Sequence, residues 1–169
     1  MKVGVPNDEV SDERMKQEIL IFEYLKPNGL SCIPKCLGKG RLNDTIEYSI
    51  FQHTDFSIKE YFEANGIPGK LNHEQVIVQM IQAVQDLHDL GYIHGDIKPE
   101  IFRIKDNRVL IIDLEHATEH KDNGALKPQI NCGFQKTDSY HASIKSLQGY
   151  SPSRSDDLES IGYAILSIL

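Results

Sequence analysis

The segment "YIHGDIKPEIF", from Tyr92 to Phe102, brings a histidine, an aspartate, a lysine and a proline together within a few residues. Within it, Asp96 and Lys98 stand one residue apart, and Pro99 follows them. Side chains two positions apart in an extended segment point to the same side. The carboxylate of Asp96 and the ammonium of Lys98 can therefore face one substrate oxygen, as a base and as a charge-neutralising cation.

A long amphipathic helix is predicted directly before this segment. Asn72 is a favourable N-cap residue, and Gln75 lies three positions on, at the spacing of a capping box. Gly91 ends the pattern, as glycine often does at a helix C-terminus. The apolar positions that share one helical face are Val76, Met80, Val84 and Leu87.

After the segment, the sequence predicts a buried strand, a long polar loop and a final helix. The strand "RVLIID" runs from Arg108 to Asp113, and the apolar helix from about Asp157 to Leu169. Asp113 ends the strand, where an aspartate can bind a metal ion or can cap the next turn. This order of elements describes a site assembled where loops leave strands, the usual position of the chemistry in α+β proteins.

The first third of the chain predicts a helix and a pair of strands. Apolar spacing and early acidic residues favour a helix from Asp12 to Leu25. The β-branched and aromatic residues of "TIEYSIFQHT" favour strands that meet at a turn around Leu42 to Asp44. We expect an ordinary turn at Gly38 to Gly40. In "DFSIKEYFEANG" we expect a short helix closed by Gly66.

Composition limits the class of protein. A chain of 169 residues with 40% apolar residues is sufficient for one domain with a continuous core. A net charge of -7 argues against a broad surface for nucleic acid or anionic membrane, and no run is long enough to span a bilayer. The spacing of the cysteines lacks the second pair that a zinc site needs, so reduced, partly buried thiols are expected at Cys32, Cys36 and Cys132.

Three separated motifs together carry a resemblance to a known family. "HGDIKPE" resembles the catalytic loop of the eukaryotic protein kinases, and "VLIIDLE" resembles the strand and metal-binding triplet that follow it. "SRSDDLESIGY", from Ser153 to Tyr163, is similar to the sequence entering the large buried helix of the casein kinase 1 and vaccinia-related kinase group. The Gly95 of "HGD" and the "ASIKS" segment also resemble this group. The similarity runs from Lys2 to Leu169.

The resemblance implies a set of site residues. Asp96 matches the catalytic base and Lys98 the lysine on the phosphate side. Lys2 matches the strand lysine that holds the α- and β-phosphates of ATP, and Glu18 its ion-pair partner on the helix. Asp113 matches the magnesium aspartate. From the residues alone, Lys2 can instead be an exposed lysine at a frayed terminus, and Glu18 part of a solvated helix face.

Two further residues have structural roles by the same resemblance. Asp157 matches the buried helix carboxylate that accepts hydrogen bonds from the backbone of the catalytic loop. His94 is expected to pack and to form hydrogen bonds in that loop, because a lone histidine here is more often structural than catalytic.

The sequence departs from the family at the metal site. Ile101 stands where the family has an asparagine, and its hydrocarbon side chain has no oxygen for magnesium. The family's Asp-Phe-Gly is Asp113-Leu114-Glu115, so Glu115 adds negative charge where ATP phosphates would lie. Repulsion of the nucleotide is the expected consequence.

The expected fold is an α+β, truncated protein-kinase-like domain over residues 1–169. It comprises a partial small lobe to about residue 51, without a glycine-rich loop, and a partial helical lobe over about 52–169, ending in the large buried helix. Lys2 would start the third strand of the family's small lobe, so a fragment of a longer kinase stays an alternative.

Two functions remain open: a pseudokinase or kinase fragment that binds a protein partner, and an active Ser/Thr kinase that uses ATP with a single magnesium ion. A protein partner or substrate, no nucleic acid, no membrane, and a cytoplasmic or nuclear location are expected.

Overall fold

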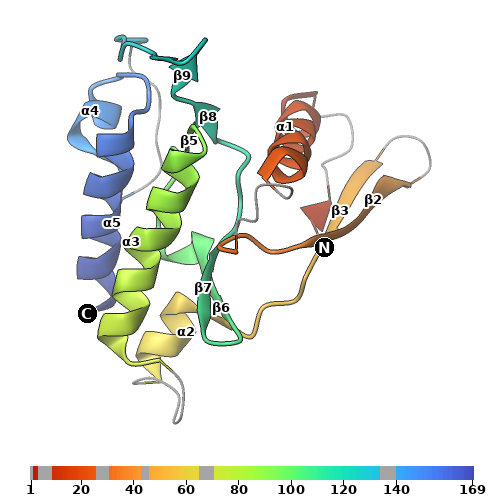
Figure 1. Ribbon diagram of the computed structural model, residues 1–169, viewed down its shortest axis with the longest axis vertical. Helices are drawn as coiled ribbons and strands as arrows, with labels where there is room; N and C mark the ends of the chain where they lie inside the picture. Colours follow the sequence, from red (N-terminus) through yellow and green to blue (C-terminus); the bar gives the residue numbers. More distant parts are fainter. Residues whose placement is uncertain (1, 4–8, 26–30, 43–45, 65–70, 134–139) are drawn as a thin grey trace.

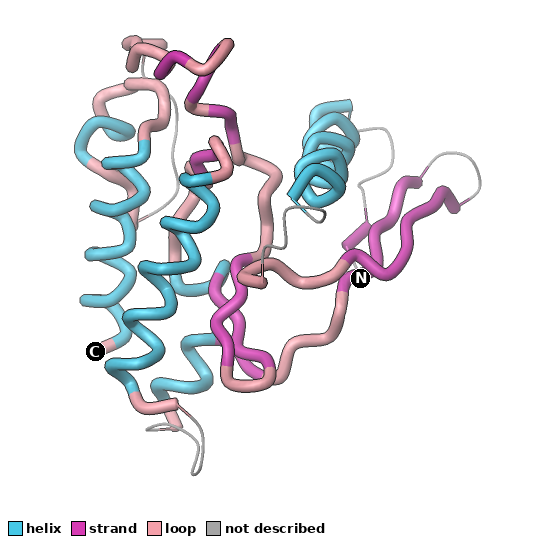
Figure 2. The backbone as a smooth tube through the Cα atoms, in the orientation of Figure 1, coloured by secondary structure: helices cyan, strands magenta, loops and turns pink. Residues whose placement is uncertain are grey.

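The computed structural model describes residues 2–3, 9–25, 31–42, 46–64, 71–133 and 140–169. Two groups of elements are joined by the segment that follows residue 51 (Figure 1). The first group is a small sheet with one helix, within residues 2–51, and the second group is mainly helical and holds the rest of the chain (Figures 1 and 2). The chain thus has the mixed α+β architecture predicted from its sequence.

The first group is a three-stranded antiparallel sheet with one helix beside it. The strand order is β1-β3-β2, with β1 at Lys2–Val3, β2 at Cys36–Leu42 and β3 at Ile46–Phe51. Helix α1 spans Glu9–Leu25, so it begins before the predicted start at Asp12. The turn expected around Leu42 to Asp44 falls largely on residues outside the described ones.

The expectation of a turn at Gly38 to Gly40 was wrong. Both glycines lie inside β2, and Gly40 pairs with Tyr48 of β3. A Cβ on Gly40 would lie 2.7 Å from the hydroxyl oxygen of Tyr48. Glycine at this position therefore lets the tyrosine ring lie close across the neighbouring strand, which local sequence signals do not reveal.

The second group is built around helix α3, which spans His73–Asp89. The predicted capping box is confirmed: Gln75 N donates to Asn72 Oδ1 at 2.8 Å, and Asn72 N donates to Gln75 Oε1 at 3.0 Å. The four predicted core positions, Val76, Met80, Val84 and Leu87, have no exposed surface. This helix packs against β7, at Arg108–Ile111, and against α5, at Arg154–Ile168.

Short elements complete this group. Strand β4 (Phe56–Ser57) leads into α2 (Ile58–Glu63), whose predicted closing residue Gly66 lies outside the described ones. The sheet order is β4-β6-β7, with β6 at Phe102–Lys105. The polar loop contains more order than expected: strand β5 (Tyr92–Ile93) pairs with β8 (Thr118–Glu119), β9 (Lys121–Asp122) pairs with β10 (Ala125–Leu126), and α4 spans Ile144–Leu147.

Two predicted boundaries need correction. The buried strand ends at Ile111, two residues before Asp113, because Asp113 adopts a φ of +66° that leaves the extended conformation. The last helix starts at Arg154 instead of about Asp157, because Ser153 and Asp156 form a capping box at its N-terminus. Asp157 therefore lies in the first turn, close to the loop that contains Asp96.

Hydrogen bonds from α1 and from the segment after it connect the two groups. Ile111 N in β7 donates to Cys32 O at 2.6 Å, and Gln17 Nε2 in α1 donates to Ala117 O at 2.9 Å. A helix of the first group thereby contacts the chain that follows β7.

Candidate active site

The loop from Tyr92 to Ile101 holds the predicted catalytic pair. Gly95 has a φ of +79°, a conformation that favours glycine, and a Cβ there would lie 3.1 Å from the carbonyl oxygen of His116. The glycine therefore permits both the bend of the loop and its close approach to the segment after β7. Pro99 to Ile101 form a 3-10 turn that leads into β6.

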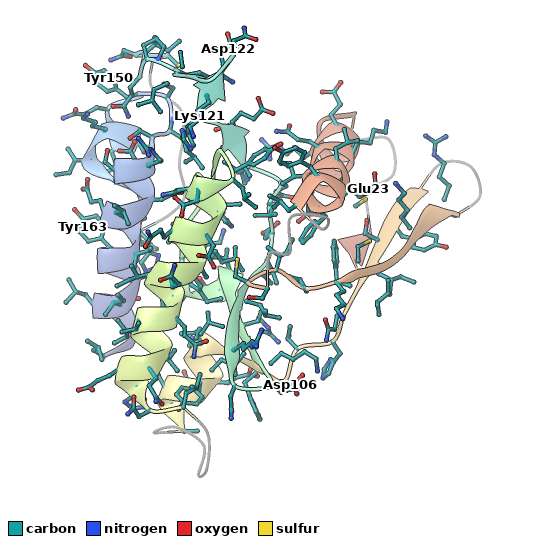
Figure 3. All side chains as sticks on the ribbon, viewed as in Figure 1. Glu23, Asp106, Lys121, Asp122, Tyr150 and Tyr163 are labelled. Atoms are coloured by element: carbon teal, nitrogen blue, oxygen red, sulfur yellow. The ribbon has the colours of Figure 1, made fainter. Side chains whose placement is uncertain are left out.

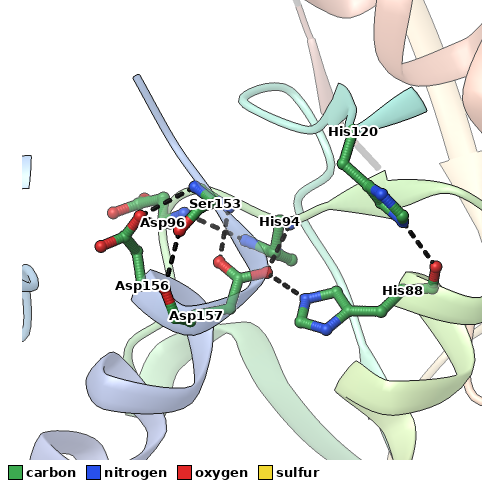
Figure 4. A network of polar contacts seen from close by, with 9 residues as sticks. His88, His94, Asp96, His120, Ser153, Asp156 and Asp157 are labelled. Carbon is green, nitrogen blue, oxygen red and sulfur yellow. Dashed lines mark hydrogen bonds and ion pairs between the residues drawn. The ribbon is translucent and has the colours of Figure 1, made fainter. Parts of the chain in front are cut away.

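Asp157 fixes this loop, as the sequence predicted. Its carboxylate accepts hydrogen bonds from His94 N at 2.8 Å and from Gly95 N at 2.9 Å (Figure 4). It also accepts one from His88 Nε2 at 2.7 Å, a contact that the sequence did not predict. The side chain is 2% exposed. Three donors around a buried carboxylate make Asp157 the residue that joins α5 to the loop.

His94 is a structural residue of the loop, in agreement with the prediction. It has no exposed surface; its Nε2 donates to Ile112 O at 3.2 Å, and its Nδ1 accepts from Asp96 N at 3.3 Å. Burial lowers the pKa of His94, although the charges of Asp157, Asp96 and Asp113 oppose this effect. A neutral imidazole can accept the bond from Asp96 N, so it helps to hold the backbone of Asp96.

Asp96 and Lys98 contact each other, whereas their spacing predicted only that they lie on the same side of the loop. Lys98 Nζ donates to Asp96 Oδ2 at 2.5 Å, and their side chains are 33% and 20% exposed. Partial burial pulls the pKa of Lys98 down, but the hydrogen bond and charge of Asp96, with Asp113 and Glu100, raise it overall. The pair thus presents a carboxylate and a firmly charged ammonium to solvent at one point of the loop.

Ile101 is a core residue. Its side chain is 1% exposed and belongs to the main hydrophobic cluster together with Phe102, Val109 and Ile111. Its backbone carbonyl accepts a hydrogen bond from Ile112 N at 2.9 Å, which ties the 3-10 turn to the end of the β7 segment. The position that would supply a second metal ligand therefore supplies packing.

Glu18 and Asp113 lie at the end of β7. Glu18 is 1% exposed, and its Oε1 accepts a hydrogen bond from Leu114 N at 2.9 Å, so the alternative of a solvated helix face is wrong. Lys2 lies in β1, but its side chain is outside the described ones, so the Lys2–Glu18 ion pair stays a prediction. Asp113 is partly buried.

A cleft of about 540 Å³ lies between the two groups of elements. Its volume is within the range of small-molecule sites, about 300–1,000 Å³. Its lining contains carboxylates, an arginine and aromatic side chains. The lining includes Glu18, Phe22, Phe51, Thr54, Arg103 and Asp113.

Sequence reasoning missed three residues around this site. His88 bonds Asp157, and His120 Nε2 donates to His88 O at 2.8 Å (Figure 4). Arg103 lines the cleft and donates from Nε to Thr54 Oγ1 at 3.0 Å. A usable signal for His88 was its position near the C-terminal end of the predicted amphipathic helix. For Arg103 there was no such signal, because the sequence predicted no strand at Phe102–Lys105.

The cleft that Asp113 lines has space for a ligand of nucleotide size, but its described residues do not form a complete set of magnesium ligands. Within the described residues, no group of three or more His, Cys, Asp or Glu side chains is arranged to hold a metal ion. Glu115 instead lies 3.5 Å from His116 Nε2. Magnesium can be held by one or two carboxylates together with phosphate oxygens, so Asp113 is the residue that would contribute if the ion arrived with ATP.

The three cysteines are free thiols, as expected. Cys32 is buried and its Sγ donates to Ala83 O, while Cys36 is partly buried and Cys132 is exposed. Burial, assisted by the charge of Asp86, raises the pKa of Cys32 to about 12. Among the described helices, none is both long and apolar enough to cross a bilayer.

Comparisons with known proteins agree with this architecture. No family model matches the chain. A "Probable serine/threonine-protein kinase" of Dictyostelium discoideum is 41% identical over 164 residues, which are 89% of this chain and 32% of that protein. A "Probable casein kinase I homolog" of Encephalitozoon cuniculi is 33% identical over 99 residues, 54% of this chain and 31% of the relative. The chain thus spans about a third of the length of these relatives.

A solved structure supports the same fold. The structure of vaccinia related kinase 3 matches with a TM-score of 0.72 at 20% sequence identity, over 99% of this chain and 57% of that one. The resemblance seen in the motifs is therefore confirmed at the level of the fold.

Proposed function

We propose that this chain, which has a protein-kinase fold of the casein kinase 1 and vaccinia-related type, is a catalytically impaired kinase-like protein that acts by binding a protein partner. The observation that carries the proposal is Ile101. Its side chain is 1% exposed in the core, at the position where the motif would place a metal-binding amide. Hydrocarbon cannot coordinate magnesium, and a buried position cannot be re-aimed at the cleft without opening the core.

The charge around Asp113 supports the same proposal. Glu115, two residues on, is partly buried and would add a second negative charge near the phosphates of a nucleotide. Phosphoryl transfer depends on positioning and on electrostatic stabilisation of the transferring group. The loss of either contribution costs orders of magnitude in rate.

A second candidate function is an active Ser/Thr kinase with a single magnesium ion. The contact of Asp96 with Lys98 and the support of their loop by Asp157 favour it, because both keep a base and a cation in a fixed relation. In this candidate Asp96 orients the substrate hydroxyl, Lys98 neutralises phosphate charge and Asp113 binds the metal ion. Lys2 would then hold the α- and β-phosphates, with Glu18 as its ion-pair partner.

The proposed partner is a protein. A net charge of -7 disfavours nucleic acid, because binding to phosphate backbones depends on excess Lys and Arg. We also propose a cytoplasmic or nuclear location, where thiols such as Cys132 stay reduced.

We expect weak or undetectable binding of magnesium-ATP by calorimetric titration. The reason is that Ile101 removes a metal ligand and Glu115 adds negative charge near the phosphates. Asp113→Asn is the matched variant: any residual binding that depends on magnesium is expected to disappear in it. A dissociation constant in the low micromolar range, about 7 to 8 kcal/mol of binding free energy, would contradict the expectation.

A further inference from the structure

A groove lies on the outer side of the first group of elements, between α1 and the β2–β3 hairpin. It encloses about 480 Å³ and is separate from the cleft that Asp113 lines. Its lining combines three cations with three apolar or aromatic side chains and one glycine. These residues are Lys16, Ile19, Leu20, Lys39, Gly40, Arg41 and Tyr48.

The helical wall of the groove is one stripe of α1. Lys16, Ile19, Leu20 and Glu23 follow the i, i+3, i+4, i+7 spacing of a single helix face. Leu20 is 65% exposed, so a large apolar side chain of this stripe remains open to solvent. In Figure 3, Glu23 lies between α1 and the hairpin. Glu18 points elsewhere, because it bonds Leu114 N at the end of β7.

The strand wall owes its shape to Gly40. Because a Cβ there would lie 2.7 Å from the hydroxyl oxygen of Tyr48, glycine lets the tyrosine ring lie against the neighbouring strand in this position. The "GKG" of the sequence therefore shapes a surface hollow that an apolar side chain can fill. Tyrosine contributes a large contact area to interfaces at low entropic cost.

The charges of the groove favour an anionic occupant. Lys39 pairs with Glu23 at 2.5 Å, but their side chains are 50% and 54% exposed, so a bound carboxylate can exchange for Glu23 at little cost. Arg41 lies opposite Glu47 in the strand register. Lys16 is exposed in the same lining. Three cations thus line one hollow of a chain whose net charge is -7.

We infer that this groove docks an acidic peptide segment of a protein partner. An apolar side chain of the segment fills the hollow beside Leu20 and Tyr48, and its carboxylates contact Lys16, Lys39 and Arg41. The inference rests on the proposed partner-binding function and gives the partner a chemistry.

The test uses fluorescence polarisation with a labelled twelve-residue peptide of glutamate and aspartate that contains two phenylalanines four positions apart. We expect saturable binding that weakens at least tenfold, about 1.4 kcal/mol, in Leu20→Asp and in the double variant Lys16→Glu/Lys39→Glu. Replacing both phenylalanines of the peptide by serine is expected to weaken binding as well. Both variants change exposed side chains, so thermal unfolding should confirm that they fold.

The control variant is Lys59→Glu on α2, which makes one such Lys→Glu change away from the groove, at a side chain that is 66% exposed. Equal weakening by Lys59→Glu, or no saturable binding at all, would overturn the inference. A third outcome would also overturn the inference: the unmodified chain binds phosphatidylserine vesicles but not the peptide, and the groove variants lose the vesicle binding. The groove would then be a lipid site. Failure of peptide docking would not affect the proposed lack of catalysis. Phosphate transfer that depends on Asp96 would overturn the proposed lack of catalysis and would not affect the docking groove.

Discussion

Asp157→Ala is expected to lower the free energy of unfolding by about 3 kcal/mol, because it removes a buried charged acceptor from three donors. His94 N, Gly95 N and His88 Nε2 all point at this carboxylate, which is 2% exposed. Without it, two backbone amides and one imidazole are left without their acceptor in the interior. Chemical denaturation followed by circular dichroism measures the loss.

Two variants sharpen this prediction. Asp157→Asn keeps one oxygen but turns an amide group toward the donors, so we expect a smaller loss than for alanine. Asp122→Asn changes an aspartate that is exposed in β9, and a surface change should alter stability by no more than about 0.5 kcal/mol. If Asp157→Ala unfolded at the same denaturant concentration as the unmodified chain, the joining of α5 to the catalytic loop would be wrong.

Ile101→Asn is expected to lower the free energy of unfolding by about 3 kcal/mol, because it exchanges buried hydrocarbon for an amide without partners. The side chain is 1% exposed and packs with Phe102 and Ile111. If the loop belonged to a catalyst weakened at this position, the same substitution would restore an oxygen for magnesium. We expect the loss of stability and no gain of phosphate transfer.

Ile101→Val is the matched control, since it removes one methylene and keeps an apolar side chain. Its expected cost is about 1 kcal/mol. Unchanged stability of Ile101→Asn, or magnesium-dependent phosphate transfer that appears only in this variant, would show that position 101 faces the cleft and not the core.

The sequence predicted those parts of the fold that depend on local signals. Asn72 and Gln75 predicted the start of α3, because a capping box is formed by residues three positions apart. The spacing of Asp96 and Lys98 predicted that both side chains lie on the same side of the loop, and in the structure they contact each other. The role of Asp157 came from the resemblance, since nothing near Asp157 in the sequence indicates bonds to His94 and Gly95.

Other features depend on contacts between distant segments, and these escaped prediction. Gly38 to Gly40 carry turn-forming residues, yet pairing with β3 places them in a strand. Glu18 is charged but buried, because Leu114 N, far along the chain, supplies a donor. Arg103 donates to Thr54, which lies 49 residues earlier in the chain. Such positions are set by tertiary packing, which overrides local propensity.

The proposed lack of catalysis is tested most directly by measuring phosphate transfer from labelled ATP, with magnesium, to a generic Ser/Thr protein substrate. The unmodified chain is compared with Asp96→Ala prepared in the same way, so that a contaminating kinase contributes equally to both. We expect the two proteins to transfer phosphate equally, at the background level. Transfer by the unmodified chain that is absent from Asp96→Ala would contradict this expectation and establish a working kinase despite Ile101.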